Sequence, residues 1–552
     1  MESKARDFFF DALVKSAELY EKTMDENTGR FLAPNGGWAV THQDAMLAYA
    51  YLYITPGREN PYYQNPKALD TVLKAAQALR DWQYPDGQVE FIKVDGSKWG
   101  PIYMPWTFYH WLETYILLRD ILPEETRKDW EIGLMPAMES YGKQDPEKIH
   151  NIPVWQAMCV HRAGKEFGRE DWIQNADALI RNTCLAQDEC GFWPEHKGPT
   201  TTYNFVYTHA LGLYRLHGGS VDVLESLKRA IKFMQVYAYP NGALVETIDG
   251  RTKYSRLADG AKTGTRALPG CLSTRGGIRF IESQLNKYSH DHITLADTAV
   301  LLIKMDQMDD SLIDPDPGFE GFDLPDFTVQ YGLGNIVRKG NREISLSAYT
   351  APLTESRWGM DRQTFVSVWT PESDLVLGGG NSKNQPDHST FVLKRKDGTL
   401  LSYIPTAGRI VSDGEISLDY GDTAVCSIRG EISDHGTITL TYSIDRKDPN
   451  LTWQVGLPLK PELDPEKSEI VSYRTGKQNV FEYNGAKVTF EGDCRVTLPS
   501  RTFNPYAEDG KPPLSECVML VNIDPEGDTL TVTIEPAEAK TSSYPQNPIS
   551  AR

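Results

Sequence analysis

The chain has 552 residues, of which 40% are hydrophobic, 24% charged and 11% aromatic, a composition typical of a folded globular protein. This length exceeds one ordinary hydrophobic core, so we expect two or three domains. The formal net charge of −19 argues against nucleic acid and anionic membranes as partners. The seven cysteines include no CxxC pair, so neither a disulfide framework nor a zinc ribbon is predicted.

The N-terminal stretch MESKARDFFFDALVKSAELYEK has an amphipathic helical pattern without the apolar core or cleavage site of a signal peptide. No apolar run approaches the roughly 18 residues of a membrane-spanning helix. We therefore expect a cytoplasmic protein, or a periplasmic one if the native N-terminus precedes this sequence. The sequence leaves the oligomeric state open.

Residues 1–306 carry helical periodicity, and several of the expected helices open with proline at the first turn. Turn-rich aromatic loops such as APNGGW (33–38) and YPDGQ (84–88) separate them. This alternation of helices and short loops predicts antiparallel helical hairpins arranged in an (α/α) toroid. The expected helices span residues 4–23, 42–53, 66–82, 105–120, 123–141, 153–167, 171–185, 202–217, 221–236, 270–285 and 293–304.

Residues 327–536 instead alternate β-branched and polar side chains between Gly, Asp, Asn and Pro turns, which predicts an antiparallel β-sandwich. An acidic, Pro- and Gly-rich linker at 307–326 separates the two domains, and a polar tail follows at 537–552. The expected strands include residues 343–349, 365–370, 389–395, 424–432, 437–444, 451–457, 487–492 and 529–535.

The stretch GFWPEHKGPTTTYNFVYTHALGLYRLHG (191–218) concentrates polar aromatic residues at the start of an expected helix. Thr202 is a plausible N-cap, which puts Tyr203 and Asn204 in the first turn, and we expect Asn204 and Tyr207 to contact the substrate. A helix N-terminus presents unpaired N–H groups and partial positive charge, so it suits an anionic substrate group. We therefore expect the chemistry of the protein here.

Three motifs carry a resemblance to the heparinase II/III-like polysaccharide lyases and their alginate-lyase relatives. DECGFWPEHKGPTTTYN (188–204) is similar to the stretch that ends in the family's catalytic Tyr, here Tyr203, although Asn204 stands where the family usually has His. His150-Asn151 resembles, in inverted order, the family's Asn-His pair that neutralises a uronate carboxylate. The resemblance covers about residues 140–410 and implies a helical toroid followed by a β-sandwich.

The other two motifs resemble loops beside the family's cleft. YPNGALVETIDGR (239–251) implies substrate contacts from Glu246, Arg251 and the nearby Tyr254. NQPDHSTFVLKRKDGTLLSYIPTAG (384–408) is similar to a strand pair that supplies an active-site His, here His388, and sometimes a metal ligand. The His/Asp order is rearranged, so no cofactor is expected and a structural metal stays a weaker alternative.

The implied reaction is β-elimination from a uronic-acid-containing oligosaccharide. The substrate carboxylate is neutralised by His150 and Asn151, a base removes the C5 proton, and an acid protonates the departing O4. Tyrosine has a reference pKa of about 10, so cationic neighbours such as Arg251 are expected to lower the pKa of Tyr203. The helix N-termini expected next to Tyr203 and next to His150-Asn151 carry partial positive charge, so they also suit a bound carboxylate.

Further polar and aromatic residues are candidates for sugar contacts, each with a plain structural alternative. Trp106, Tyr109 and His110 at the start of one helix form either a sugar platform or part of the core. Arg275 in LSTRGG is either a carboxylate ligand or a salt-bridge partner.

Two other classes of function remain open from the sequence. A glycoside hydrolase on the same toroid would use two carboxylates, for which Glu195, Glu246 and Asp249 are candidates. A glycan-binding protein that has lost the chemistry would tolerate the departures at Asn204 and at His150-Asn151.

Overall fold

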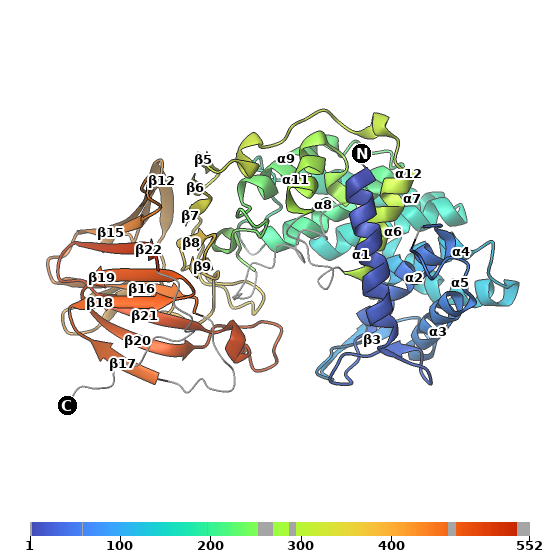
Figure 1. The fold of residues 1–552 in the computed structure, drawn as a ribbon, viewed down its shortest axis with the longest axis horizontal. Helices are drawn as coiled ribbons and strands as arrows, with labels where there is room; N and C mark the ends of the chain where they lie inside the picture. The colour runs from blue at the N-terminus through green and yellow to red at the C-terminus, as the bar shows by residue number, and fades with distance from the viewer. Residues whose placement is uncertain are drawn as a thin grey trace. The chain divides into compact units, whose positions relative to one another are not determined.

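The computed structural model describes residues 3–57, 59–195, 197–251, 269–285, 294–461 and 471–537 (Figure 1). The chain divides into two compact units. The helical unit comprises Met1–Gln187, Phe205–Ile231 and Gly260–Gly318, and the β-unit comprises Asp188–Asn204, Lys232–Asp259 and Phe319–Arg552. The division therefore differs from the predicted ranges, because two segments of the predicted helical domain belong to the β-unit.

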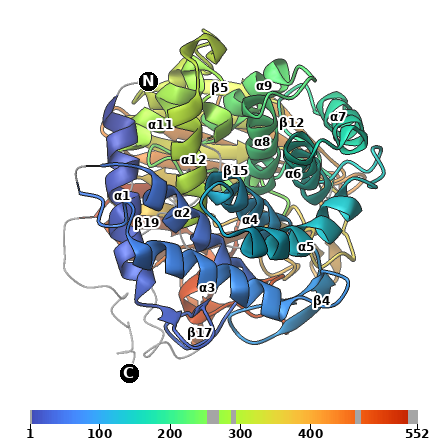
Figure 2. The same ribbon diagram turned by 90° about the vertical axis from the view of Figure 1, so that its right-hand side faces the viewer.

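The helical unit begins with α1 and returns to it, because α12 packs against both α1 and α2. Figure 2 shows α2, α4, α6, α8 and α12 on the inside of this unit and α1, α3, α5 and α7 around them. This is the predicted toroid of helical hairpins. The helices are α1 (Ser3–Glu21), α2 (Met46–Ile54), α3 (Pro66–Trp82), α4 (Pro105–Leu118), α5 (Glu124–Tyr141), α6 (Asn151–Phe167), α7 (Glu170–Leu185), α8 (Thr201–Leu216), α9 (Leu224–Val236), α11 (Arg275–Gln284) and α12 (Leu295–Gln307).

Helix α3 illustrates how the local sequence determines these elements. The Asn65 side chain accepts a hydrogen bond from the Lys67 backbone N–H at 3.0 Å, and Pro66 occupies the first helical position. Val72 and Leu79, two turns apart, are buried on the same face. Because proline at the first helical position marks where a helix begins, the bounds of such helices could be predicted from the sequence to within a few residues.

Short elements complete the helical unit. Two small antiparallel hairpins pair β1 with β2 and β3 with β4. Their strands are β1 (Met24–Asp25), β2 (Arg30–Phe31), β3 (Val89–Ile92) and β4 (Lys98–Ile102). Within the described residues, the 3-10 helices of the two units are η1 (Val40–Ala45), η2 (Glu246–Ile248), η5 (Asp310–Leu312), η6 (Glu320–Asp323) and η7 (Leu514–Glu516).

The β-unit is an antiparallel sandwich of two sheets. The larger sheet has the order β17-β20-β21-β16-β9-β8-β7-β6-β5, with β10 beside β16 and β11 beside β10, and the smaller has the order β12-β13-β14-β15-β22-β19-β18. The strands are β5 (Phe327–Tyr331), β6 (Gly334–Lys339), β7 (Arg342–Ser347), β8 (Val366–Thr370), β9 (Asp374–Leu377), β10 (Phe391–Arg395), β11 (Leu400–Ser402), β12 (Ala407–Ser412), β13 (Glu415–Asp419), β14 (Ala424–Ile432), β15 (Ile438–Arg446), β16 (Leu451–Leu459), β17 (Val471–Thr475), β18 (Gln478–Tyr483), β19 (Ala486–Glu491), β20 (Asp493–Ser500), β21 (Val518–Asp524) and β22 (Thr529–Pro536).

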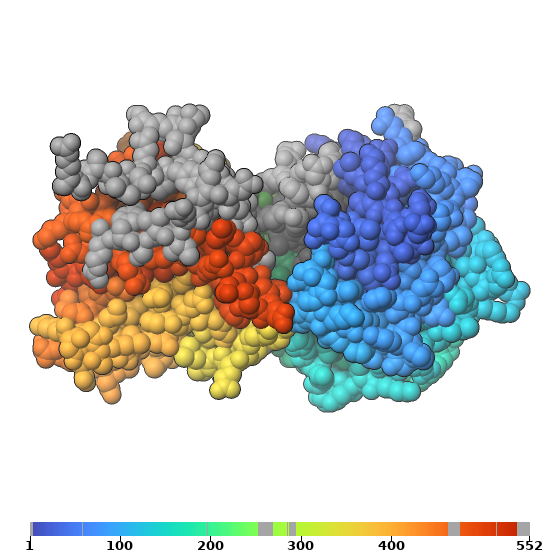
Figure 3. Space-filling view, turned by 90° about the horizontal axis from the view of Figure 1, so that it is seen from below, coloured from blue at the N-terminus to red at the C-terminus, as the bar shows by residue number. Residues whose placement is uncertain are grey.

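The core of the β-unit lies between the two sheets. Alternate residues of β14 and β15 are buried, including Cys426, Ile428 and Leu440, and they pack with Val455 and Val521 of the larger sheet. This alternation is the period of two that predicted the sandwich. In the space-filling view, the blue-to-cyan helical unit and the yellow-to-red β-unit each form a closely packed body (Figure 3).

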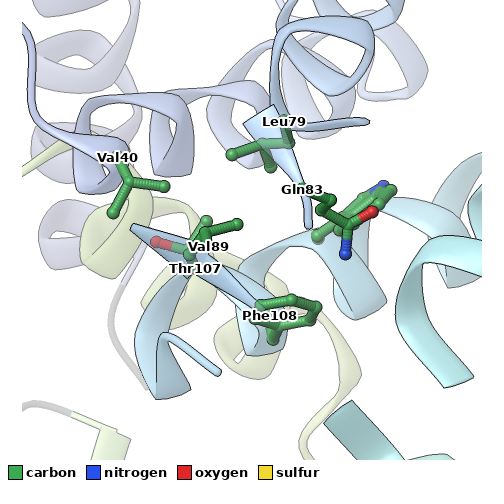
Figure 4. Close-up of a pocket in the computed structure, with 7 residues that line it drawn as sticks. Val40, Leu79, Gln83, Val89, Thr107 and Phe108 are labelled. Atoms are coloured by element: carbon green, nitrogen blue, oxygen red, sulfur yellow. The ribbon is translucent and has the colours of Figure 1, made fainter. Parts of the chain in front are cut away.

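Two further features complete the description of the fold. None of the helices in the described ranges combines the length and the apolar character needed to cross a membrane. A small apolar hollow in the helical unit is lined by Val40, Leu79, Val89 and Phe108, with Gln83 and Thr107 beside them (Figure 4). No titratable group lines it, so the hollow offers nothing for acid–base chemistry.

Candidate active site

Four side chains of the β-unit lie around Tyr203, and together the five form what we call the Tyr203 cluster: Glu195, Tyr203, Arg251, Trp358 and Tyr506. They come from four separate stretches of the chain. Glu195 lies in the loop before α8, Tyr203 in the first turn of α8, and Arg251 shortly after η2. Trp358 lies between β7 and β8, and Tyr506 between β20 and β21.

The hydroxyl groups of Tyr203 and Tyr506 lie 2.6 Å apart, and either can be the donor. Tyr203 is half-buried, whereas Tyr506 keeps 37% of its surface exposed. A proton on the Tyr203 oxygen therefore has a hydrogen-bonded route to a solvent-exposed hydroxyl.

Arg251 connects the ring of Tyr203 to a buried carboxylate. Its guanidinium carbon lies 3.9 Å from the centre of the Tyr203 ring, which is cation–π geometry. One guanidinium nitrogen also donates to Glu195 Oε2 at 2.9 Å. Only 4% of the Glu195 surface is exposed to solvent, so the Arg251 guanidinium compensates a carboxylate that is removed from water.

The protonation state of Tyr203 differs from the sequence-based expectation. Burial raises the pKa of Tyr203 well above its usual range, with a further increase from Tyr506. Arg251 lowers that pKa, as predicted, but only in part, because desolvation of the phenolate is the larger effect. Tyr203 is thus a protonated group at neutral pH, suited first to donate a proton.

An aromatic surface adjoins the two tyrosines. The Trp358 ring lies 5.4 Å from the Tyr506 ring, with the Arg251 guanidinium 5.8 Å and the Arg357 guanidinium 5.6 Å from its centre. Trp358 is half-buried and Tyr506 is exposed. Accessible aromatic rings beside cations are the kind of surface that stacks on a sugar ring and attracts an anionic substituent.

The loop that carries Tyr506 is held in place from both ends. The Tyr506 backbone N–H donates to the Asn504 side chain at 3.0 Å, and Asn504 N donates to Gly510 O at 2.8 Å. Arg357 donates to the Ala507 carbonyl at 2.6 Å. Arg357 therefore supports both the Tyr506 loop and the Trp358 ring.

The sequence predicted Tyr203, Arg251 and Glu195, but it gave no sign of Tyr506 or Trp358. Tyr506 lies 303 residues from Tyr203 along the chain. Its surroundings, RTFNPYAEDG, read as an ordinary polar turn, and no local pattern links such a turn to a helix start in another part of the chain.

Two carboxylates that the sequence offered for chemistry are structural. Glu246, predicted as a substrate contact, is buried and accepts hydrogen bonds from Tyr239 Oη at 2.7 Å and Gly379 N at 2.9 Å, and burial raises its pKa. Asp249 is also fully buried and accepts from the Thr202 backbone N–H at 2.9 Å. Both were placed on cleft loops by sequence, but long-range contacts with the sheet and with α8 cover them.

Two more predicted substrate contacts in the β-unit are buried. His388 is 3% exposed with its Nε2 3.1 Å from Ser500 Oγ, and burial lowers its pKa to about 4. Asn204 is 1% exposed, and its side-chain oxygen accepts from Trp193 N at 3.3 Å. The prediction of sugar contact is therefore corrected for both. Tyr254 lies outside the described residues.

His150 and Asn151 belong to the helical unit and are described within it. His150 is the N-cap of α6, in extended conformation, and Asn151 is the first residue of the helix. The Asn151 Nδ2 lies 3.5 Å from His150 Nε2. His150 is half-buried and Asn151 is 1% exposed. The predicted helix is confirmed, and it begins two residues before Pro153, at Asn151.

The other predicted sugar contacts of the helical unit lie mostly in its interior. Tyr109 is fully buried with its hydroxyl 3.3 Å from His217 Nε2, and Tyr207 is 1% exposed. His110 is 2% exposed, and its Nδ1 lies 3.1 Å from Asp44. The expectation of a platform is therefore corrected for Tyr109 and His110, and that of a substrate contact for Tyr207.

Two predicted contacts of the helical unit keep access to solvent. Trp106 is half-buried beside Trp155, with the ring centres 6.0 Å apart. Arg275 is exposed in the first turn of α11, after Thr274, whose hydroxyl caps that helix by accepting from Gly277 N at 2.9 Å. These two remain candidates.

Within the part of the chain that the structure describes, no three His, Cys, Asp or Glu side chains are grouped so as to hold a metal ion. His388, the residue at which a structural metal was considered, faces Ser500 instead.

The chain combines a toroid of helical hairpins with an antiparallel β-sandwich. No protein-family profile and no curated protein sequence matches the chain. Among solved structures, the chain is similar to heparinase III, with a TM-score of 0.52 and 11% identity over 98% of this chain and 86% of that chain. The chain thus has the heparinase-like polysaccharide lyase fold, and at this identity the likeness concerns the fold alone.

Two further structures show weaker likeness. Chondroitinase AC lyase aligns with a TM-score of 0.48 and 13% identity, over 97% of this chain and 83% of that one. The GH76A α-1,6-mannanase from Salegentibacter sp. HEL1_6 aligns with a TM-score of 0.35 and 13% identity, over 54% of this chain and 98% of that one.

Proposed function

We propose that the protein is a glycan-processing enzyme that cleaves a uronic-acid-containing oligosaccharide by β-elimination, with the Tyr203 cluster as its catalytic centre. The observation that carries the proposal is the contact of the Tyr203 hydroxyl with Tyr506, beneath a guanidinium that is itself paired with Glu195. An acid–base hydroxyl, a cation and an exposed aromatic surface are thereby combined in one place.

In the proposed reaction the C5–H bond and the C4–O4 bond of the uronide break and a C4=C5 double bond forms. The C5 proton leaves to a base and O4 gains a proton, so no water is consumed. Tyr203 is protonated at neutral pH and first passes its proton through Tyr506 to solvent, and Arg251 stabilises the resulting phenolate. The phenolate accepts the C5 proton, and the Tyr203 hydroxyl so formed donates this proton to the departing O4. Tyr203 then regains a solvent proton through Tyr506.

The hydrolase alternative has less support in this geometry. It requires two carboxylates that face the substrate. Glu246 and Asp249 are buried behind hydrogen bonds, and Glu195 is paired with Arg251. A glycan-binding protein without chemistry would not need the acid–base pair of tyrosines.

The deciding assay incubates the protein with a panel of uronic-acid oligosaccharides and follows ultraviolet absorbance. A lyase forms an unsaturated, absorbing product, a hydrolase releases reducing sugar without that absorbance, and a binding protein does neither. Tyr203→Phe is expected to lower kcat by about 100-fold or more while binding persists. Tyr403→Phe, a half-buried tyrosine of the same unit, is the matched control and should keep full activity.

Activity of Tyr203→Phe equal to wild type would contradict the proposal, and loss of activity in Glu195→Gln with reducing-sugar product would favour hydrolysis. The roles proposed for His150 and Asn151, carboxylate neutralisation and help with proton transfer, are tested in the same assay by His150→Ala and Asn151→Ala.

A further inference from the structure

Asp249 connects the two chain segments that carry Tyr203 and Arg251. It is fully buried. Its Oδ2 accepts hydrogen bonds from the Thr201 hydroxyl and the Thr202 backbone N–H, both at 2.9 Å, and its Oδ1 accepts from the Arg251 backbone N–H at 2.6 Å. One carboxylate therefore fixes the residue before Tyr203 and the backbone of Arg251 itself.

Backbone N–H groups and a guanidinium lie near the Asp249 carboxylate. The first turn of α8 directs unpaired N–H groups and partial positive charge toward it. Arg362, buried with 1% exposure, lies close enough for Asp249 to raise the pKa of the guanidinium, although burial has the larger effect and lowers that pKa to about 10. Hydrogen bonds from backbone N–H groups at a helix N-terminus to a carboxylate are among the stronger ones in proteins.

Arg362 joins the same two segments through their backbones. It donates to Pro199 O at 2.7 Å, just before α8, and to Ile248 O at 2.8 Å, just before Asp249. A Cβ atom at Gly198 or Gly250 would lie 2.5 Å from the Arg362 guanidinium, so only glycine allows this approach.

Asn381 connects the Asp249 segment to the larger sheet. Its Oδ1 accepts from the backbone N–H groups of Gln363 at 3.0 Å and Thr364 at 3.1 Å, and its Nδ2 donates to the Asp249 carbonyl at 2.8 Å. It follows three glycines with positive φ, Gly378–Gly380, at the end of β9. The sequence LGGGN, which has no phosphate-loop spacing, thus serves to bring Asn381 under Asp249.

We propose that Asp249 is a positioning residue that sets the Arg251 guanidinium over the Tyr203 ring. The inference rests on the proposed function, since it concerns the same cluster. Rate depends steeply on the placement of catalytic groups, and a small displacement of Arg251 removes its effect on the Tyr203 phenolate. In Asp249→Asn the amide presents N–H groups to backbone donors on one side, so at least one of the three hydrogen bonds is lost.

The test reads the Tyr203 environment directly, without relying on turnover. Fluorotyrosine is incorporated at position 203, and its fluorine NMR resonance is compared in wild type, Arg251→Gln, Asp249→Asn and the double variant. Asp249→Asn is expected to shift the resonance in the same direction as Arg251→Gln, and the double variant to add little. Asp397→Asn, whose carboxylate caps an exposed turn of the same unit at Thr399 N (2.9 Å), is the control and should leave the resonance in place.

Kinetics supply the second readout. Asp249→Asn is expected to lower kcat by about 10- to 100-fold with a smaller change in KM. Thr201→Val, which removes one of the three hydrogen bonds, should lower kcat less, and Thr201→Ser, which keeps the hydroxyl, should act like wild type. If Asp249→Asn does not fold, the Thr201 pair carries the same comparison.

The outcomes separate this inference from the proposed function. A wild-type resonance in Asp249→Asn, or in Thr201→Val should the first variant not fold, overturns the positioning role whatever happens to activity. If wild type cleaves no uronide, the proposed function fails, yet a shared resonance shift in Asp249→Asn and Arg251→Gln still establishes that Asp249 positions Arg251.

Discussion

The guanidinium carbon of Arg251 lies 3.9 Å from the centre of the Tyr203 ring. This contact places a permanent cation against a hydroxyl-bearing ring whose pKa is raised by burial. The cation favours the phenolate, while burial favours the phenol, so the pair determines how readily Tyr203 gives up its proton. The same guanidinium compensates Glu195, which couples Tyr203 to a buried ion pair.

Removing the cation should affect activity and stability together. In Arg251→Gln the Tyr203 pKa rises further and the Glu195 carboxylate is left buried without its partner. We expect kcat/KM for uronide cleavage to fall by about 100-fold and the free energy of unfolding to fall by about 3 kcal/mol. Ultraviolet assays and urea unfolding measure the two effects.

The double variant Arg251→Gln/Glu195→Gln separates them. It carries no unpaired buried charge, so most of the stability should return while activity stays low. Recovery of activity in the double variant would show that Arg251 does not act on Tyr203 in the reaction.

Tyr506→Phe removes the hydroxyl that lies 2.6 Å from Tyr203 while keeping its ring beside Trp358. Because Tyr203 loses its route to solvent protons, we expect kcat to fall by about 10-fold, less than in Tyr203→Phe, with KM little changed. Steady-state kinetics with Tyr403→Phe as control measure the effect. A change in KM alone would assign Tyr506 to binding.

Lys304 gives the helical unit a pH dependence in the alkaline range. Burial lowers the pKa of Lys304 to about 8, against an ordinary value of 10.5, despite Glu113 4.0 Å away. Arg162 lowers this pKa further, and His217 Nδ1 lies 3.3 Å from the ammonium. Between about pH 8 and the ordinary value the unfolded chain holds more protons, so stability attributable to Lys304 rises with pH there.

Lys304→Met should abolish this contribution. From about pH 7 to about pH 9.5, we expect wild type to gain about 2 kcal/mol in free energy of unfolding relative to Lys304→Met, as measured by urea unfolding followed by far-ultraviolet circular dichroism. The exposed Lys148→Met is the control and should track wild type. Parallel pH profiles for wild type and Lys304→Met would contradict the prediction.

His388 gives the stability of the β-unit a pH dependence in the acidic range. Burial lowers the pKa of His388 from 6.5 to about 4. The unfolded chain therefore binds more protons between these values, and the stability from neutral His388 is complete above about pH 6.5 and is lost as the pH falls toward 4.

His388→Gln keeps a group that can bond Ser500 but cannot be protonated. Between about pH 7 and about pH 4.5, we expect wild type to lose about 2 to 3 kcal/mol more unfolding free energy than His388→Gln. His435→Gln, an exposed histidine of the same unit, should behave as wild type. An equal acid loss in wild type and His388→Gln would contradict the assignment.

The sequence by itself determined the two architectures, most of the helix and strand bounds, and part of the cluster. Proline starts and the helical period specified α3 and α4, and alternation specified β14 and β15, because these signals act between neighbours in the chain. Tyr203, Glu195 and Arg251 were found because they lie in short motifs close to a helix start.

Only the tertiary structure decided which of these side chains share a site and which are covered. Tyr506 and Trp358 join the Tyr203 cluster from the sandwich loops, while Glu246 and His388 are buried by contacts with the sheet. The burial and pairing of these side chains depend on segments that are distant along the chain, so no local periodicity in the sequence predicts them. For the same reason Asp249, a carboxylate in an ordinary loop by sequence, is a buried link between α8 and Arg251 only in the folded protein.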